Sequence, residues 1–286
     1  MQLEIIKFIQ QIANPFWDVF FIIISAMSEE FIIIALLGLL YWCMDKRLGY
    51  KIGFLYVLNA PLNLIIKAFV NAPRPIGSEG IRSIYKETAT GSSFPSGHSQ
   101  LGGGLFYFLF KNDKCIIRRA VFLIIAILIP VSRLYLGVHY PVDVVVGFIL
   151  GVIMVYVSGV IFEKLYERHT AWLVLFALPA IVFCIIDGGS DSCKMAGLIL
   201  AFLFGMVIEM KYIDFSVKAS LPVQILKYVC GVAFVILLRS GMKLIFPDGA
   251  LWGFIRYFVI GIFVTIVYPL LIKKIGTYGK FYKKSM

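Results

Sequence analysis

Two of the three histidines in this chain stand where nucleophilic or proton-transfer chemistry is possible. His98 follows the tripeptide Pro-Ser-Gly, and His139 stands four residues before Asp143. Four residues make about one helical turn, so the side chains of His139 and Asp143 are expected to point the same way. An aspartate beside a histidine fixes its tautomer and stabilises its charged form, which prepares the imidazole as a nucleophile or base. Taken alone, the pair is equally compatible with an ordinary surface contact.

The turn before His98 has the composition of an anion-binding helix start. The first N–H groups of a helix are unpaired and carry partial positive charge. Gly97 would let an oxyanion approach the backbone closely, and Ser96 offers both its N–H and its hydroxyl. Pro95 is expected in the first turn of the helix. His98 could then donate a proton to a bound group, and a plain helix start capped by a nearby serine is the alternative.

Three cations accompany these residues. Lys67 ends an apolar run and Arg74 follows it after six residues, whereas Arg133 ends a later apolar run. Each alone would be a cation at the end of a membrane span, where long basic side chains are common. Three cations, a helix start that attracts anions and two histidines together suit a tetrahedral oxyanion, namely phosphate. His169, beside a basic residue at the other side, is expected to be an ordinary interfacial residue.

The composition is that of an integral membrane protein. Of the 286 residues, 60% are hydrophobic, and the mean hydropathy is +0.92. Apolar runs near the length that crosses a bilayer recur along the chain, and no polar segment is long enough for a soluble domain. A single span across 16–44 is disfavoured because it would bury Glu29 and Glu30 in hydrocarbon. We therefore expect ten spans, at about 14–28, 31–44, 49–69, 97–110, 119–136, 143–162, 171–187, 194–209, 222–238 and 252–272.

The basic residues indicate how these spans are oriented. If the N-terminus is cytoplasmic, 18 of the 27 lysines and arginines fall on its side of the membrane and nine on the other. The positive-inside rule makes the richer side cytoplasmic. The net charge of +11 is thus an orientation signal and not a sign of nucleic-acid binding. Both termini are expected in the cytoplasm, and all candidate site residues on the extracytoplasmic face. The short outward loops favour a bacterial inner membrane.

The five cysteines are scattered and form no C-x-x-C pair. Most fall within or near predicted spans, where cysteine behaves as a small apolar residue, so disulfides and metal ligation are not expected. No Cys, His and carboxylate cluster suggests a metal site, and no cofactor is expected.

The three stretches together resemble the signature of the type 2 phosphatidic acid phosphatase superfamily, which also includes the vanadium haloperoxidases. That signature is Lys, six residues, Arg-Pro; then Pro-Ser-Gly-His; then Ser-Arg, five residues, His, three residues, Asp. This chain reads Lys67…Arg74-Pro75, Pro95-Ser96-Gly97-His98 and Ser132-Arg133…His139…Asp143. It departs from the signature at no invariant position.

The resemblance implies an all-α polytopic membrane helical bundle. A six-helix phosphatase core would occupy 1–165, and 166–286 would form an extension of about four transmembrane helices. By position in the signature, His139 would attack phosphorus and form a phosphohistidine, Asp143 would orient it, and His98 would protonate the leaving oxygen. The groups implied to hold the phosphoryl oxygens are Lys67, Arg74, Ser96, Gly97 and Arg133.

The function expected on these grounds is metal-independent hydrolysis of a lipid phosphate or pyrophosphate at the membrane interface. Phosphatidic acid, prenyl pyrophosphate, phosphatidylglycerol phosphate and sphingoid phosphate all qualify as substrates. A lipid phosphotransferase would use the same site, and a transporter or flippase is the alternative from another class. A haloperoxidase is disfavoured because the spans point to a lipid. The expected partners are the lipid substrate and membrane lipids, with no nucleic acid, and the oligomeric state stays open.

Overall fold

The computed structural model describes residues 1–166 and 170–275, and all regular elements among them are helical. His169 and four of the basic residues assigned to the cytoplasmic side, Arg168, Lys280, Lys283 and Lys284, lie outside the described residues. The α-helices in chain order are α1 (Gln2–Gln10), α2 (Pro15–Ala26), α3 (Glu30–Gly38), α4 (Lys46–Val70), α5 (Gly104–Asn112), α6 (Ile116–Tyr135), α7 (Pro141–Tyr166), α8 (Leu178–Asp187), α9 (Ser190–Ile208), α10 (Leu221–Ile245) and α11 (Ala250–Ile262).

Shorter helical turns of other types extend or join these helices. The 3₁₀ turns are η2 (Lys86–Thr88) and η4 (Thr170–Ala177). The π-helical turns are η1 (Leu39–Met44), η3 (His98–Gly103), η5 (Glu209–Ile213) and η6 (Phe263–Val267).

The apolar runs of the sequence are helices at the expected places. Within the described residues, five helices are long and apolar enough to cross a membrane, and the bent pair α2 and α3–η1 is a sixth candidate. The all-α membrane class with a helical extension beyond the core is therefore confirmed.

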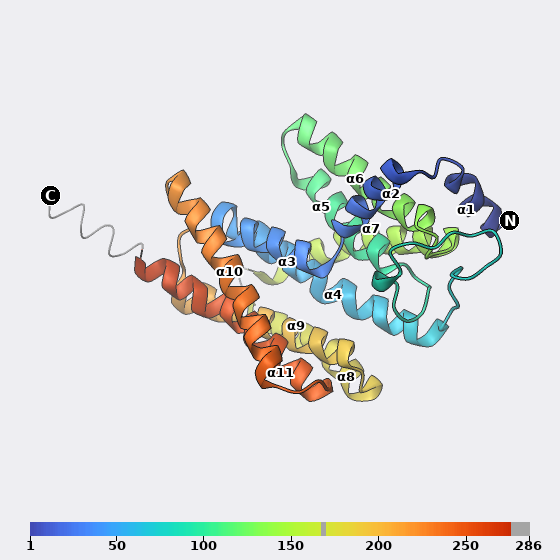
Figure 1. Cartoon of the computed structure of the whole chain (residues 1–286). Helices are drawn as coiled ribbons and strands as arrows, with labels where there is room; N and C mark the ends of the chain where they lie inside the picture. The colour runs from blue at the N-terminus through green and yellow to red at the C-terminus, as the bar shows by residue number, and fades with distance from the viewer. Residues whose placement is uncertain (167–169, 276–286) are drawn as a thin grey trace. The chain divides into compact units, whose positions relative to one another are not determined.

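The chain divides into two compact units, each described here by itself. Met1–Ile34 and Leu58–Val160 form the first, and Ala35–Val57 with the described residues from Ile161 onward form the second. Within the first unit α6 packs against α1, α2 and α5 (Figure 1). Within the second, α9 packs against α8 and α11 (Figure 1). All the candidate site residues belong to the first unit.

The expectation that the N-terminus lies opposite the candidate site is wrong. Gln10 Nε2 donates to the carbonyl of Arg82 at 2.6 Å and to that of Tyr135 at 2.8 Å. Asp18 forms an ion pair with Arg82, and Gln2 accepts from the backbone N–H of Val142. Arg82 is in the loop between α4 and η3, and Tyr135 ends α6, so α1 lies at the same end of the bundle as the candidate site. Charge counting misplaced α1 because this helix carries a single lysine, Lys7.

α2 and α3–η1, expected as two separate spans, form one apolar helix pair that bends by 58° at a short break, which is the geometry of a broken span or of a re-entrant loop. From the sequence, a single span across this segment was disfavoured because of the carboxylates at 29 and 30. The argument fails at Glu29, since its carboxylate accepts a hydrogen bond from the Tyr85 hydroxyl at the break and does not need to face lipid.

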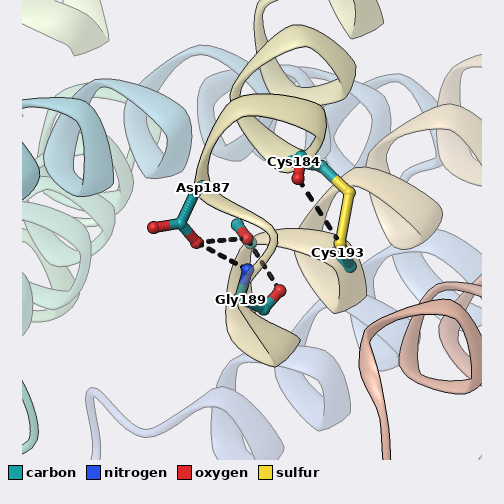
Figure 2. Close-up of a disulfide and its surroundings, with 5 residues drawn as sticks. Cys184, Asp187, Gly189 and Cys193 are labelled. Carbon is teal, nitrogen blue, oxygen red and sulfur yellow. Dashed lines mark hydrogen bonds between the residues drawn. A yellow bond between two sulfur atoms is a disulfide. The ribbon is translucent and has the colours of Figure 1, made fainter.

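The expectation of free cysteines is also wrong for two of the five. Cys184 and Cys193 form a disulfide across the turn between α8 and α9 (Figure 2). Gly188 takes the left-handed conformation that ends α8, and the Asp187 carboxylate accepts from the N–H of Gly189 (Figure 2). The turn therefore folds the two helix ends together and brings cysteines nine residues apart into contact. Spacing alone did not reveal the pair because it depends on this turn.

The position of α1 is testable by labelling single cysteines in a background without the other reactive cysteines. Ala13, Glu79 and Lys114 are exposed and lie after α1, in the loop after α4 and between α5 and α6. In sealed membrane vesicles, Ala13→Cys and Glu79→Cys are expected to react with an impermeant maleimide from the same side, and Lys114→Cys from the other. Labelling of Ala13→Cys together with Lys114→Cys would contradict this position of α1.

Candidate active site

The structure brings the candidate site residues together from four segments of the first unit. Lys67 stands in the last turn of α4 and Arg74 in the loop that follows, while Arg133 stands in the last turn of α6. Arg74 Nη1 lies 3.0 Å from His139 Nε2, and both Arg74 and Lys67 donate to the carbonyl of Ser92. His98, at the start of η3, is close enough to Lys67, Arg74, Arg133 and His139 for their charges to act on it.

Both ring nitrogens of His139 have neighbours, and those of Nδ1 set its tautomer. Its Nδ1 lies 3.4 Å from Asp143 Oδ2 and 3.3 Å from Ser93 Oγ. Ser93 Oγ donates to Asp143 Oδ2 at 2.5 Å. With Nδ1–H directed at the carboxylate, the lone pair is on Nε2, the nitrogen that faces Arg74. The imidazole is 2% exposed, so Asp143 and Ser93 fix both its tautomer and its direction.

Asp143 also shapes the start of α7. The helix begins at Pro141, two residues after His139, so the pair is not made by one turn of regular helix as the spacing suggested. Instead Asp143 Oδ2 accepts from the N–H of Tyr140 at 2.8 Å, which caps the helix and turns the preceding residue back. The carbonyl of Asp143 accepts from the N–H of Ser96 at 3.0 Å. The turn with His98 is thereby tied to the turn with His139.

The electrostatic environment keeps His139 neutral before an anion binds. Burial lowers the pKa of the imidazole, the hydrogen bond to Asp143 opposes that shift, and Arg133, Arg74 and Lys67 lower the pKa further. A nucleophilic nitrogen must carry a free lone pair, and a lowered pKa preserves it at neutral pH and on its acid side.

Three polar nitrogen atoms in the site are buried without a hydrogen-bond partner: Nε and Nη2 of Arg133 and Nε2 of His98. Arg133 is fully buried, and only its Nη1 is occupied, by hydroxyls of Ser25 and Thr88. Buried polar groups are almost always paired in folded proteins. Unpaired donors of this kind, beside two further cations, mark the place where an anion would complete their hydrogen bonds.

The Pro-Ser-Gly-His turn differs from the expected helix start. Pro95 precedes the helix, with a cis bond from Phe94, and the helix opens as the π-helical turn η3 at His98. Ser96 is fully buried and its hydroxyl accepts from Ser99 Oγ at 3.0 Å. Gly97 leaves no room behind it, because a Cβ there would come within 3.3 Å of Asn63 Oδ1.

Sequence reasoning missed an amide network behind this turn. Gln100 Nε2 donates to Asn59 Oδ1 at 2.7 Å, and Asn63 Nδ2 donates to Gln100 Oε1 at 2.7 Å. Asn63 also donates to the carbonyl of Pro95 at 3.4 Å. Asn59 and Asn63 lie one turn apart inside the membrane helix α4, where apolar residues are the rule. Two polar side chains on one face of that helix were the signal available in the sequence. The network fixes η3, and with it His98, on α4.

Close packing between helices holds the other segments that surround the site. A Cβ at Gly147 would lie 2.7 Å from the Ser96 carbonyl oxygen, and one at Gly151 would lie 2.3 Å from that of Gln100, so α7 approaches the His98 segment at its glycines. Phe21 of α2 stacks on Tyr135 with ring centroids 4.3 Å apart. This contact anchors the end of α6 just after Arg133.

Among residues 1–166 and 170–275, no group of three or more His, Cys, Asp or Glu side chains is placed to hold a metal ion. The charges that act on Arg133 and His98 are those of the neighbouring cations and of the Glu29 carboxylate. That the chemistry needs no metal stays a prediction.

Comparison with known proteins identifies the families that these segments match. Residues 48–167 match a family model described as the PAP2 superfamily. Residues 193–280 match one described as PAP2 superfamily phosphatase, transmembrane extension. The two models together cover more than half of the chain, and the first contains every candidate site residue.

The individual relatives are distant in sequence, and two of them are phosphatases by their names. The chain is 28% identical over 166 residues to a lipid A 4'-phosphatase of Bacteroides thetaiotaomicron, covering 52% of this chain and 71% of that protein. It is 33% identical to phosphatidylglycerophosphatase B of Bacillus subtilis, over 36% of this chain and 53% of that one. The crystal structure of Aquifex aeolicus LpxE superposes with a TM-score of 0.50 at 27% identity, over 55% of this chain and 93% of that one.

Ser93 supplies a sharp test of the geometry around His139. Ser93→Ala removes a hydrogen bond to the Asp143 carboxylate, and bonds to charged groups contribute about 1.5–3 kcal/mol. We expect kcat for phosphate-ester turnover to fall at least about tenfold. Ser78→Ala makes the same change in the same loop without any bond to the site and is expected to leave kcat unchanged. An unaltered kcat in Ser93→Ala would show that His139 does not depend on this support.

Proposed function

We propose that this chain, which belongs to the PAP2 superfamily of phosphatases, hydrolyses a lipid phosphate or pyrophosphate through a phosphohistidine on His139. The observation that carries this proposal is the pairing of an oriented, neutral imidazole with unpartnered donors. His139 Nε2 lies 3.0 Å from Arg74 Nη1, and His98 is close enough to His139 and Arg133 for their charges to act on it. A tetrahedral anion there would receive both a nucleophile and charge-assisted hydrogen bonds.

The first half of the reaction forms the phosphoenzyme. The lone pair of His139 Nε2 attacks phosphorus while the bond to the leaving oxygen breaks. His98 gives its proton to that oxygen, so the product alcohol or phosphate leaves neutralised. Asp143 stabilises the positive charge that develops on the His139 ring. Lys67, Arg74 and Arg133, with Ser96 and the N–H of Gly97, hold the phosphoryl oxygens as charge builds on them.

The second half regenerates the enzyme. His98, now neutral, accepts a proton from a water molecule whose oxygen attacks the phosphohistidine. The phosphorus–nitrogen bond breaks, its electron pair returns to Nε2, and inorganic phosphate leaves. The same histidine thus acts as acid and then as base, which requires only that it stay beside the leaving-group side of phosphorus.

Membrane burial supports a lipid as the substrate. The site residues stand at the ends of α4, α6 and α7, where a headgroup would meet them while its acyl or prenyl tails stay in hydrocarbon. The named relatives act on lipid A and phosphatidylglycerophosphate by their names. We extend the proposal to phosphorylated lipids as a class, including phosphatidic acid, prenyl pyrophosphate and sphingoid phosphate.

We place this site on the extracytoplasmic face of a bacterial inner membrane, with α1 on the same side. The excess of basic residues at the opposite ends of the helices supports that orientation. We also propose that 1–165 forms the catalytic core and 166–286 an extension, which the matches at 48–167 and 193–280 support.

The reaction is tested by phosphate release from the detergent-purified chain in excess chelator. The panel holds phosphatidic acid, phosphatidylglycerol phosphate, undecaprenyl pyrophosphate, sphingosine 1-phosphate and a lipid A phosphate. We expect release from at least one lipid at a rate that the chelator does not change. His139→Ala is expected to abolish it, and His98→Ala to lower kcat by about 10²–10⁴-fold, the usual contribution of an acid–base group.

The matched control is His169→Ala, the same change at the histidine that the sequence assigns to the opposite side. It is expected to retain full activity. Undiminished release by His139→Ala would overturn the mechanism. Dephosphorylation of the lipid only after a lipid or sugar alcohol is added, with a phosphorylated acceptor and no free phosphate as product, would make the chain a phosphotransferase acting through the same site. Lipid movement across vesicles that survives loss of both site histidines would indicate a transporter.

A further inference from the structure

The break between α2 and α3 lies against the candidate site. α2 ends at Ala26, α3 begins at Glu30, and the axis bends by 58° between them. Ser28 of the break packs so closely on η3 that a Cβ at Gly102 would come within 2.1 Å of the Ser28 Cβ. Ser25 and Ser28 are both buried. A break in a membrane helix leaves backbone groups without their helical hydrogen bonds, and hydrocarbon cannot replace those bonds. Such breaks are therefore found where the backbone lines a site.

Ser25 contacts Arg133 directly. Its Oγ accepts from Arg133 Nη1 at 2.6 Å, and Thr88 Oγ1 accepts from the same nitrogen at 3.2 Å. Two hydroxyls from different segments therefore hold one corner of the guanidinium. The other edge, made of Nε and Nη2, is the edge with no protein partner.

Glu29 connects the break to Thr88 through the loop after α4. The Tyr85 hydroxyl donates to the Glu29 carboxylate. Thr88 Oγ1 donates to the Tyr85 carbonyl at 3.1 Å across the short turn η2. Tyr85 has a φ of 57°, a left-handed conformation that is unfavourable for a bulky side chain unless its surroundings hold it. Glu29 supplies that hold.

From these contacts we infer that Ser25, in the last turn of α2, and Glu29, in the break that follows, are positioning residues for Arg133. Ser25 fixes Nη1 directly, and Glu29 fixes it indirectly by anchoring Tyr85 and hence Thr88. The inference rests on the proposed phosphatase function and deepens it. None of Ser25, Glu29, Tyr85 or Thr88 touches the substrate.

The physical benefit is that the Nε and Nη2 groups of the Arg133 guanidinium are held in place before an anion binds. A guanidinium binds a phosphoryl group best through two parallel N–H groups, a geometry that a rotating side chain would have to find at each turnover. With Nη1 immobilised, the Nε and Nη2 edge faces the anion before it arrives. Donors fixed in this way need no reorganisation as charge develops in the transition state.

The test is a double-mutant cycle between Ser25→Ala and Arg133→Lys, with Tyr85→Phe as an independent second variant. Loss of one hydrogen bond to a charged group predicts about a tenfold drop in kcat/KM for Ser25→Ala and for Tyr85→Phe. In the Arg133→Lys background, which has no fork to aim, Ser25→Ala is expected to change kcat/KM by less than about twofold. Ser28→Ala is the matched control, since its hydroxyl donates only to the Ser25 carbonyl and it is expected to behave as wild type.

A second readout does not depend on turnover. Orthovanadate, a phosphate analogue, is expected to raise the melting temperature of the wild-type protein and of Ser28→Ala more than that of Ser25→Ala or Tyr85→Phe. For each protein the orthovanadate shift is measured from its own melting temperature without orthovanadate, which separates positioning from folding. The inference is overturned if Ser25→Ala matches Ser28→Ala, or if the effects of Ser25→Ala and Arg133→Lys multiply. Failure of the proposed function gives a different result, namely no phosphate release by the wild type, while the orthovanadate shift still tests the aim of Arg133.

Discussion

Placing Lys67, Arg74 and Arg133 together at the end of a membrane bundle is unfavourable unless an anion balances their charge. Most of the surrounding contacts hold these side chains in place against that repulsion. Asp143 acts on Lys67 and Arg74, and Glu29 acts on Arg133. The Asp143 carboxylate is already engaged by Ser93, Tyr140 N–H and His139, and that of Glu29 by the Tyr85 hydroxyl. The unpaired nitrogens of Arg133 and His98 show where balance is missing. A phosphoryl group would supply both the charge and the acceptors, so in the proposed reaction binding and catalysis share one physical cause.

The helices act mainly as supports that keep these side chains from relaxing toward water. Amides of α4 hold the His98 segment, glycines of α7 let it approach closely, and aromatic stacking on α2 secures the end of α6. Ser25, in the last turn of α2, brings a hydroxyl to Arg133. The amides of α4 and the glycines of α7 are polar or small at positions where a lipid-facing helix would ordinarily be bulky and apolar.

The sequence predicted the helices well because they depend on local patterns, and the structure brings together the residues that the fixed spacings singled out. Apolar runs defined the helices, and fixed spacings defined Lys67, Arg74, His98, Arg133, His139 and Asp143. It failed where contacts between distant segments decide. The place of α1 depends on Gln10 reaching Arg82 and Tyr135, and the disulfide depends on the turn at Gly188. Glu29 looked too costly for a span because its partner, Tyr85, is 56 residues away.

The central claim is that His139 itself carries the phosphoryl group, and mapping the phosphorylated residue tests this most directly. The purified protein would be mixed with a turned-over lipid phosphate, quenched within milliseconds under alkaline conditions that preserve phosphohistidine, digested and analysed by mass spectrometry. The account predicts phosphate on the peptide that contains His139, with none in His139→Ala. Phosphate on another residue, or turnover with no phosphorylated peptide at any quench time, would contradict it.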